Sequence, residues 1–272
     1  MRKITKGIID IRPPGSMKAC VALVHGLGEH TGRYVRLAES LADAGYGVYG
    51  CDLPGHGHST GRRGHVASYK LLCEHVAITI AGAAEAGVPV ILLGQSMGGA
   101  LVLNYILRNE KTWPDPKAVI SLSPGLRTTK PVPSFKIFLA RLLVKITPWL
   151  TMHSGINPDD FSHDPSVAEN VRHDPLYHFR ISARMGLDII EAGNWAMKNV
   201  RSFEIPLLLM HGGGDRTTSV NASRDFASKA GPMCTYKEWE GMYHELHNET
   251  SSDEIVSYMI DWMDEITTVK IN

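Results

Sequence analysis

The 272-residue sequence has little cysteine, no excess of charge of either sign and no long hydrophobic run. Its 28 basic and 28 acidic residues balance. We therefore expect no nucleic-acid partner, because proteins that bind nucleic acids carry a basic surface. No CxxC pair occurs among the four cysteines, which are Cys20, Cys51, Cys73 and Cys234. This pattern argues against a disulfide framework and favours a reducing, cytoplasmic setting.

Signals for secretion or membrane insertion are also lacking. The first residues, MRKITKGIIDIRPPG, contain no apolar run of the kind found in a secretory signal. The longest weakly charged stretch, 76–94, contains Glu85 and Pro89 and is a poor candidate for a spanning helix. We expect a cytoplasmic protein and leave open a peripheral contact at membranes.

Apolar residues make up 43% of the chain and charged residues 21%, a composition that excludes a disordered protein. Short apolar runs alternate with longer helical patterns, which predicts an α/β fold. We expect a mostly parallel central sheet with helices on both faces. The predicted strands are 18–26, 46–53, 90–94, 117–123, 205–212 and 234–240, and the predicted helices are 34–44, 69–86, 97–109, 220–230 and 252–266.

One segment interrupts this alternation. Residues 125–204 are rich in proline and show no strand–helix rhythm, so we expect a cap inserted into a core domain formed by 1–124 and 205–272. Within the segment, 134–150 is amphipathic, with its three charged residues on one side. Two interpretations stay open: a cap helix packed on the core, or a lid that contacts lipid with its apolar face.

A candidate nucleophile lies between a predicted strand and a predicted helix. Gly94-Gln95-Ser96-Met97-Gly98 matches the GxSxG pattern of a nucleophile elbow. The serine of such an elbow sits on a strained turn, so the residues around it need almost no side chain. Gly94 and Gly98 meet this need. The alternative is a serine in an ordinary turn.

A serine nucleophile needs a base, and the base needs an orienting acid. In strand–elbow–helix enzymes both follow the serine in chain order, the acid first. Asp215 follows the strand-and-glycine run LLLMHGGG, and His244 lies in the loop after the last strand. His247 is the rival base, and a helix N-cap is the alternative role for Asp215.

Two backbone N–H groups should hold the oxyanion. We expect them to come from Met97, which follows the nucleophile, and from Leu27, which lies between Gly26 and Gly28 in the loop after the first central strand.

Several other polar residues are interpreted as structural. His25 and His30 are expected to brace the loop with hydrogen bonds, and Asp52 to belong to a turn at a strand end. His56 and His58 form an H-x-H pattern, but no neighbouring residues complete a metal site. We expect neither a metal nor a cofactor.

Six segments together resemble the monoacylglycerol lipases, which belong to the α/β-hydrolase superfamily near the lysophospholipases. The resemblance spans about 18–266 and implies an α/β-hydrolase fold with Ser96, Asp215 and His244 as the catalytic triad, and Leu27 and Met97 as oxyanion donors. The segments are HGLGEHTGRY (25–34), DLPGHGHSTG (52–61), LLGQSMGGAL (92–101), HDPLY (173–177), HGGGDR (211–216) and GMYHELHNE (241–249).

The resemblance also implies a glycerol site. Glu29, Arg33 and His247 match positions that bind the glycerol hydroxyls in animal members; the alternative is a surface Glu29–Arg33 ion pair with a solvated His247. Leu27 replaces a small residue of the animal members, which narrows the pocket near the acyl carbonyl. Thr218 replaces a reactive cysteine, which implies weaker sensitivity to thiol reagents.

The expected function is hydrolysis of the ester bond of a monoacylglycerol to fatty acid and glycerol, through an acyl-enzyme and without a metal. A lysophospholipase and a short-chain carboxylesterase are the alternative enzymes. A non-catalytic binding protein with the same fold is the alternative from another class. The expected partner is a small lipid ester, with transient membrane contact through the cap left open. The oligomeric state is not predicted.

Overall fold

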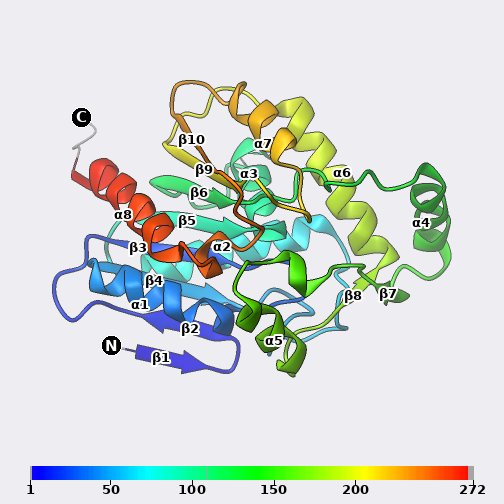
Figure 1. Cartoon of the computed structure of the whole chain (residues 1–272), viewed down its shortest axis with the longest axis horizontal. Coiled ribbons are helices and arrows are strands. Elements are labelled where there is room, and N and C mark those ends of the chain that lie inside the picture. The colour runs from blue at the N-terminus through cyan, green and yellow to red at the C-terminus, as the bar shows by residue number, and fades with distance from the viewer. Residues whose placement is uncertain (1, 109, 269–272) are drawn as a thin grey trace.

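A computed structural model describes residues 2–108 and 110–268 and has an eight-stranded sheet at its centre. The strands are β1 (Arg2–Thr5), β2 (Ile8–Ile11), β3 (Ala19–Val24), β4 (Tyr46–Cys51), β5 (Val90–Gln95), β6 (Ala118–Leu122), β9 (Leu207–Gly212) and β10 (Cys234–Trp239). Their order across the sheet is β1-β2-β4-β3-β5-β6-β9-β10. The six strands β4, β3, β5, β6, β9 and β10 are parallel, and β1 and β2 add an antiparallel edge (Figure 1). The predicted mostly parallel sheet is confirmed.

Helices cover both faces of the sheet (Figure 1). One face packs against α1 (Val35–Asp43) and α8 (Ser252–Thr268). The other packs against α2 (Tyr69–Ala84), α3 (Met97–Arg108), α6 (Ala183–Asn199) and α7 (Val220–Ala227). Successive residues of β3 alternate between these two cores. Burial on both faces is why the central strands are apolar throughout.

The predicted core strands and helices are present, with boundaries shifted by a few residues. Helix α3 ends at Arg108, and Asn109, the last residue of the predicted helix, lies outside the described residues. The β1–β2 hairpin was not predicted from the sequence. Strand β2 is four residues long and buries only Ile9 and Ile11, so its apolar pattern is too short to stand out.

The chain between β6 and β9 holds α4 (Ser134–Ile146), β7 (Thr151–His153), α5 (Pro165–His173), β8 (Arg180–Ser182) and α6. Strands β7 and β8 form a small antiparallel pair of their own. Helix α6 contributes to the same core as α2 and α3, whereas α4 projects from the edge of the molecule (Figure 1).

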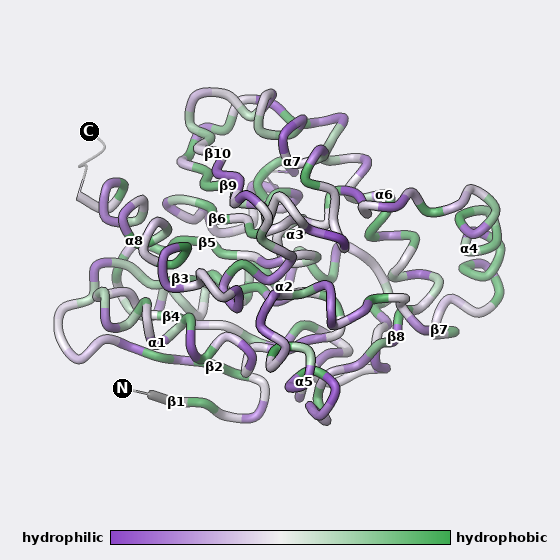
Figure 2. The backbone as a smooth tube through the Cα atoms, in the orientation of Figure 1, coloured by the Kyte–Doolittle hydropathy of each residue, from purple (hydrophilic) through white to green (hydrophobic). Residues whose placement is uncertain are grey.

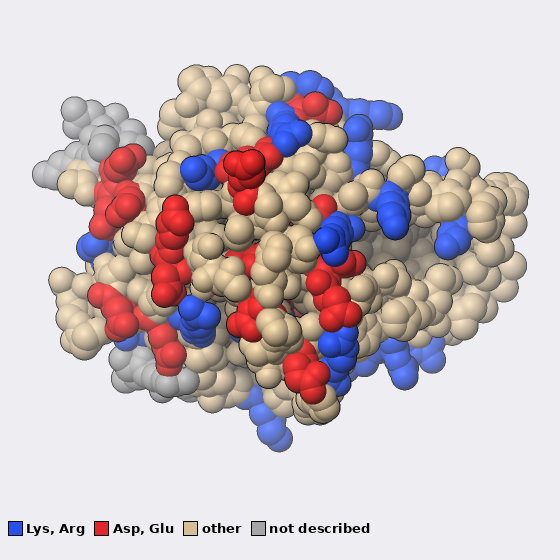
Figure 3. Space-filling view, in the orientation of Figure 1, with Lys and Arg blue, Asp and Glu red and all other residues tan. Residues whose placement is uncertain are grey.

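Helix α4 packs against α6 but has no buried residue, so it lies at the outside of the molecule and is not buried on the core as one of the two interpretations expected. Apolar residues colour much of this projecting lobe (Figure 2), which carries basic side chains at its surface (Figure 3). Elsewhere on the face that Figure 3 draws, acidic and basic groups are mixed. Within 2–108 and 110–268, no helix is both long and apolar enough to cross a bilayer.

Burial of the core strands predicts how substitutions change the free energy of unfolding. Leu208 on β9 is fully buried, so Leu208→Ala should lower the free energy of unfolding by about 2–5 kcal/mol. Leu71→Ala makes the same change on the exposed side of α2 and should cost no more than about 0.5 kcal/mol. Urea unfolding of both variants measures the difference. Equal losses would contradict the assignment of β9 to the core.

Candidate active site

Ser96 occupies a sharp turn between β5 and α3. Its φ is +57°, a left-handed conformation that a residue with a side chain rarely adopts. The flanking glycines permit the turn: a Cβ at Gly94 would lie 2.3 Å from the Gly98 carbonyl oxygen, and one at Gly98 would lie 2.3 Å from that of Val24. The GxSxG spacing thus has the steric cause that the sequence analysis proposed.

His244 joins Ser96 to Asp215. Its Nε2 lies 2.8 Å from Ser96 Oγ, and its Nδ1 lies 2.7 Å from Asp215 Oδ2. Because the carboxylate can only accept, Nδ1 carries the proton and Nε2 is free to accept one from the serine hydroxyl. Gln95 Nε2 donates to the His244 carbonyl at 3.0 Å and fixes the loop. The rival, His247, is buried elsewhere and stacks on Tyr34.

Asp215 is held from several sides. The backbone N–H groups of Thr217 and Thr218 donate to Oδ1 at 2.7 and 2.9 Å. The Thr218 hydroxyl lies 2.8 Å from Oδ2, and His211 Nε2 lies 3.1 Å from the same oxygen. Ser223 Oγ is 2.7 Å from His211 Nδ1, so His211 can donate to Asp215 while accepting from Ser223. Two histidines therefore flank one carboxylate.

The role of His211 beside Asp215 was not predicted from the sequence. Its position at the end of a buried strand, directly before the glycine turn that leads to Asp215, could have indicated a role beside this aspartate.

These contacts shift two pKa values. Burial alone would raise the pKa of Asp215, but His244 and His211 outweigh it and lower that pKa well below its usual range. Burial opposes protonation of His244, yet Asp215 outweighs burial and raises its pKa above 6.5. Asp215 thus stays ionised and stabilises an imidazolium on His244, which a general base for Ser96 requires.

The loop 25–30 lies beside Ser96. A Cβ at Gly26 would lie 3.2 Å from Ser96 Cβ, so this backbone approaches the nucleophile closely. Leu27 lines the cavity at Ser96, and Met97 is the first residue of α3, where an N–H has no partner within the helix. Both positions suit the predicted oxyanion donors.

The histidines and the aspartate interpreted as structural do brace loops. Leu53 N–H donates to His25 Nε2 at 2.8 Å, and His25 Nδ1 lies 2.8 Å from the Gly26 carbonyl oxygen. His30 Nε2 lies 2.7 Å from Asp174 Oδ2. Asp52 accepts from the backbone and hydroxyl of Thr31 at 2.9 and 2.8 Å. Burial lowers the pKa of His25 to about 4, so this ring is neutral.

Glu29 and Arg33 form a buried ion pair rather than a surface one. Glu29 Oε2 lies 3.3 Å from Arg33 Nε, and both side chains are less than 10% exposed. His247 is also buried, not solvated, and does not line the cavity at Ser96. Neither part of the alternative interpretation, a surface pair and a solvated histidine, matches the structure. The glycerol role of these three residues stays a prediction.

Glu245 joins the same cluster and was not predicted. Arg33 Nη2 donates to both of its carboxylate oxygens, at 2.9 and 2.7 Å, and Asn248 Nδ2 donates to Oε2 at 2.7 Å. Its position directly after His244 was the available signal, because a residue adjoining the base must lie near the site.

The cavity at Ser96 is about 20 Å³, room for one water molecule and not for an acyl chain. The expected tunnel is therefore closed in this structure. Three residues of the segment 125–204, Ile156, Phe161 and Tyr177, line this cavity beside Ser96. The lining residues are Gly26, Leu27, Glu29, Gln95, Ser96, Ile156, Phe161, Tyr177, Thr217, His244 and Glu245.

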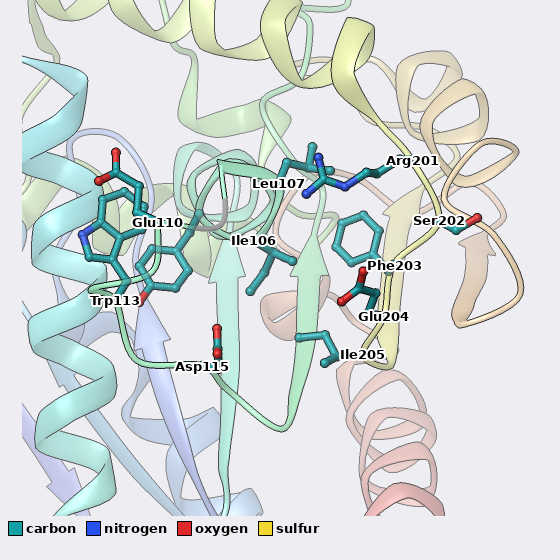
Figure 4. A pocket seen from close by; sticks show the side chains of 11 residues that line it. Ile106, Leu107, Glu110, Trp113, Asp115, Arg201, Ser202, Phe203, Glu204 and Ile205 are labelled. Atoms are coloured by element: carbon teal, nitrogen blue, oxygen red, sulfur yellow. The ribbon is translucent and has the colours of Figure 1, made fainter.

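A larger cavity of about 250 Å³ lies elsewhere (Figure 4). Glu110, Trp113 and Asp115 line one side of it, and residues 201–205 line the other. These residues precede β6 and β9, so the cavity opens at the amino ends of the strands. Ser96 follows β5 at the carboxyl ends, where α/β proteins bind their ligands. Figure 4 therefore does not show the candidate active site.

A mostly parallel sheet with helices on both faces and a serine elbow after its central strand defines the α/β-hydrolases. Comparison with known proteins identifies the family: residues 15–251 match the model of the serine aminopeptidase S33 hydrolases, and the chain belongs to this family. The resemblance predicted from the sequence is confirmed.

Individual relatives narrow the comparison. The chain is 31% identical to the phospholipase YtpA of Bacillus subtilis, over 87% of this chain and 92% of that protein. A monoacylglycerol lipase structure from Paleococcus ferrophilus matches with a TM-score of 0.86 and 33% identity, covering 97% of this chain and all of that one. The chain is also 34% identical over 91% of its length to an uncharacterized abhydrolase domain-containing protein of Dictyostelium discoideum, of which it spans only 26%. The chain is thus an α/β-hydrolase related to lipases and esterases.

The raised pKa of His244 predicts the pH dependence of activity. The ring must be neutral to accept the serine proton, so kcat/KM for a soluble ester should rise with pH through a midpoint above the usual pKa of a histidine. Asp215→Asn removes the group that raises this pKa. The midpoint should then fall, and kcat should drop by roughly 10³–10⁴-fold.

Asp225→Asn makes the same substitution at an exposed site on α7 and should change neither quantity. An unchanged midpoint in Asp215→Asn would show that Asp215 does not control the base.

Proposed function

We propose that this protein is a serine esterase that hydrolyses a single-chain acylglycerol. The observation that carries the proposal is the unbroken hydrogen-bonded series from Ser96 through His244 to Asp215. Ser96 acts as nucleophile, His244 as general base and then general acid, and Asp215 as the group that orients and stabilises the imidazolium.

The reaction follows from these roles. The Ser96 hydroxyl gives its proton to His244 Nε2, and its oxygen attacks the acyl carbonyl. The N–H groups of Leu27 and Met97 hold the developing oxyanion. His244 then protonates the departing glycerol oxygen, leaving an acyl group on Ser96. Water, activated by the same histidine, releases the fatty acid.

Two relatives support a lipid ester as substrate, since one is named a monoacylglycerol lipase and the other a phospholipase. Glu29 lines the cavity and can accept a hydrogen bond from a glycerol hydroxyl. Arg33 and His247 lie behind that wall, and we assign them to the same glycerol site as the groups that hold Glu29 and its loop. No metal or cofactor takes part in this scheme.

The segment 125–204 is proposed to act as a cap over a core formed by 1–124 and 205–272. Ile156, Phe161 and Tyr177 from this segment line the cavity above Ser96. Because that cavity is too small for an acyl chain, substrate entry requires these side chains to move. A single channel opened in this way would take one chain, which favours monoacyl over triacyl substrates.

Helix α4 of this cap is proposed to contact membrane surfaces transiently. Phe135, Phe138 and Ile146 are each more than 60% exposed, and Lys136 and Lys145 lie on the same helix. Exposed apolar side chains with interspersed cations suit the boundary between lipid headgroups and acyl chains. Such contact would bring the enzyme to a substrate that partitions into membranes.

The alternative substrate is a lysophospholipid, which the named phospholipase relative favours. A non-catalytic binding protein is disfavoured, since such proteins have no need of the complete serine–histidine–aspartate series.

A substrate panel tests the proposed reaction. Ser96→Ala should lower kcat on a monoacylglycerol by about 10³-fold or more while the melting temperature stays unchanged. Wild-type enzyme should release fatty acid from monoacylglycerols faster than from triacylglycerols. Ser228→Ala, at an exposed position, is the matched control and should retain full activity. Retention of a tenth of the wild-type kcat by Ser96→Ala would exclude this nucleophile.

Vesicle binding tests the role of α4. Replacing Phe135 and Phe138 together by serine should reduce cosedimentation with phosphatidylcholine–phosphatidylglycerol vesicles by about tenfold or more, because two large apolar side chains no longer enter the lipid. Turnover of a soluble short-chain ester should stay within about twofold, since α4 has no buried residue. The control replaces Leu71 and Ile78, which are exposed on α2, in the same way. Equal loss in both double variants would rule out a specific surface.

A further inference from the structure

The charged groups on the wall of the cavity at Ser96 are unusual for a site that could hold a phosphorylated lipid. Glu29 and Glu245 line this cavity, and among residues 2–108 and 110–268 no lysine or arginine does. Arg33, which pairs with both acids, lies behind them and lines a different cavity. A substrate headgroup beside Ser96 therefore meets two carboxyl groups and no cation.

Arg33 is also engaged by the cluster itself. Its Nη2 donates to both oxygens of Glu245, and its Nε lies 3.3 Å from Glu29 Oε2. A guanidinium is the side chain best suited to a phosphate, because its N–H groups match two oxygens at once. Here Glu245 accepts those hydrogen bonds, so a phosphate in the cavity at Ser96 could reach Arg33 only by displacing a buried carboxylate.

The ionisation of the cluster agrees with this geometry. Burial opposes ionisation of Glu245, but Arg33 outweighs burial and lowers the pKa of Glu245 below its usual range. Burial and the neighbouring Glu245 raise the pKa of Glu29. Burial lowers the pKa of His247 to about 4, so His247 adds no positive charge at neutral pH. The charge of Arg33 is thus already balanced by Glu245.

We propose that Glu245 sets the charge selectivity of the leaving-group side of the site: it admits an uncharged polyol and excludes an anionic phosphate. This inference rests on the proposed function of the same site and names the class of headgroup that it accepts. Glycerol hydroxyls can donate to the carboxylates on the wall. A phosphate monoester brings a charge of about −1.5 to −2 and only acceptors toward them. The site thereby separates monoacylglycerols from lysophosphatidic acids of equal chain length.

The test compares two substrates that differ only in the phosphate, 1-octanoylglycerol and 1-octanoylglycerol 3-phosphate, below their micellar concentrations. In the wild type, kcat/KM should favour the neutral ester by about a hundredfold, because the phosphate would lose its hydration beside two carboxyl groups with no available cation to replace it. Glu245→Gln keeps the shape of the side chain and removes its charge. This ratio should fall by about tenfold or more, since Arg33 becomes available to phosphate. A loss of catalysis that affects both substrates equally leaves this ratio of kcat/KM values unchanged.

Glu240→Gln is the matched control, because it removes the same charge from an exposed side chain after β10 and should leave the ratio unchanged. A ratio near one in the wild type, or an equal ratio in the wild type and Glu245→Gln, would overturn the proposal. If Glu245→Gln does not fold, the wild-type ratio of the two kcat/KM values still tests the proposal.

Inhibition separates this inference from the proposed function. The ethers 1-O-octylglycerol and 1-O-octylglycerol 3-phosphate cannot be hydrolysed, and each can compete with p-nitrophenyl octanoate. A neutral ether that inhibits at about tenfold lower concentration than its phosphate supports the charge selectivity even if monoacylglycerols are not hydrolysed. Equal inhibition constants, together with rapid monoacylglycerol hydrolysis, would remove the selectivity and leave the proposed function standing.

Discussion

The left-handed backbone at Ser96 is the constraint on which the rest of the site depends. Such a conformation costs a residue with a side chain of order 1 kcal/mol or more, so the surrounding structure must enforce it. Ser96 N–H donates to the Leu122 carbonyl at 2.9 Å, and Gly125 N–H donates to the Ser96 carbonyl at 2.8 Å. Both contacts come from β6 or the turn after it. The central strands therefore hold the serine in its strained position, and Gly94 and Gly98 make the close approach sterically possible.

Buried charge around this turn follows one rule: each acid receives several donors. Asp215 accepts from two backbone N–H groups and lies between two histidines, while Glu245 accepts from Arg33 and Asn248. Charges buried without such partners would be strongly destabilising. The difference between the two acids lies in what they offer the substrate. Asp215 acts through His244, whereas Glu245 lines the cavity and is proposed to select the headgroup that enters.

The sequence predicted the parts of the fold and site that local pattern encodes. Apolar runs predicted the parallel strands. Local patterns also predicted three site residues: Ser96 from the glycines around it, Asp215 from the turn before it, and His244 from its loop after the last strand. The structure brings these three residues together. Contacts between distant segments were harder to predict. Nothing in the local sequence indicates that Arg33 pairs with Glu245, 212 residues away, or that His247 stacks on Tyr34. The exposure of α4 was also undecided, because an amphipathic pattern fits a core, a partner or a lipid surface equally well.

Helix α4 packs against α6 but has no buried residue, so it contributes little to the free energy that holds the sheet together. Helix α4 is 13 residues long, a length at which an isolated helix is only marginally stable in water. Its large apolar side chains instead favour self-association, because they are exposed to solvent. Solubility and folding stability are therefore governed by different parts of this chain. A protein engineer could replace the apolar surface of α4 to obtain concentrated, monodisperse protein while leaving the hydrolase core intact.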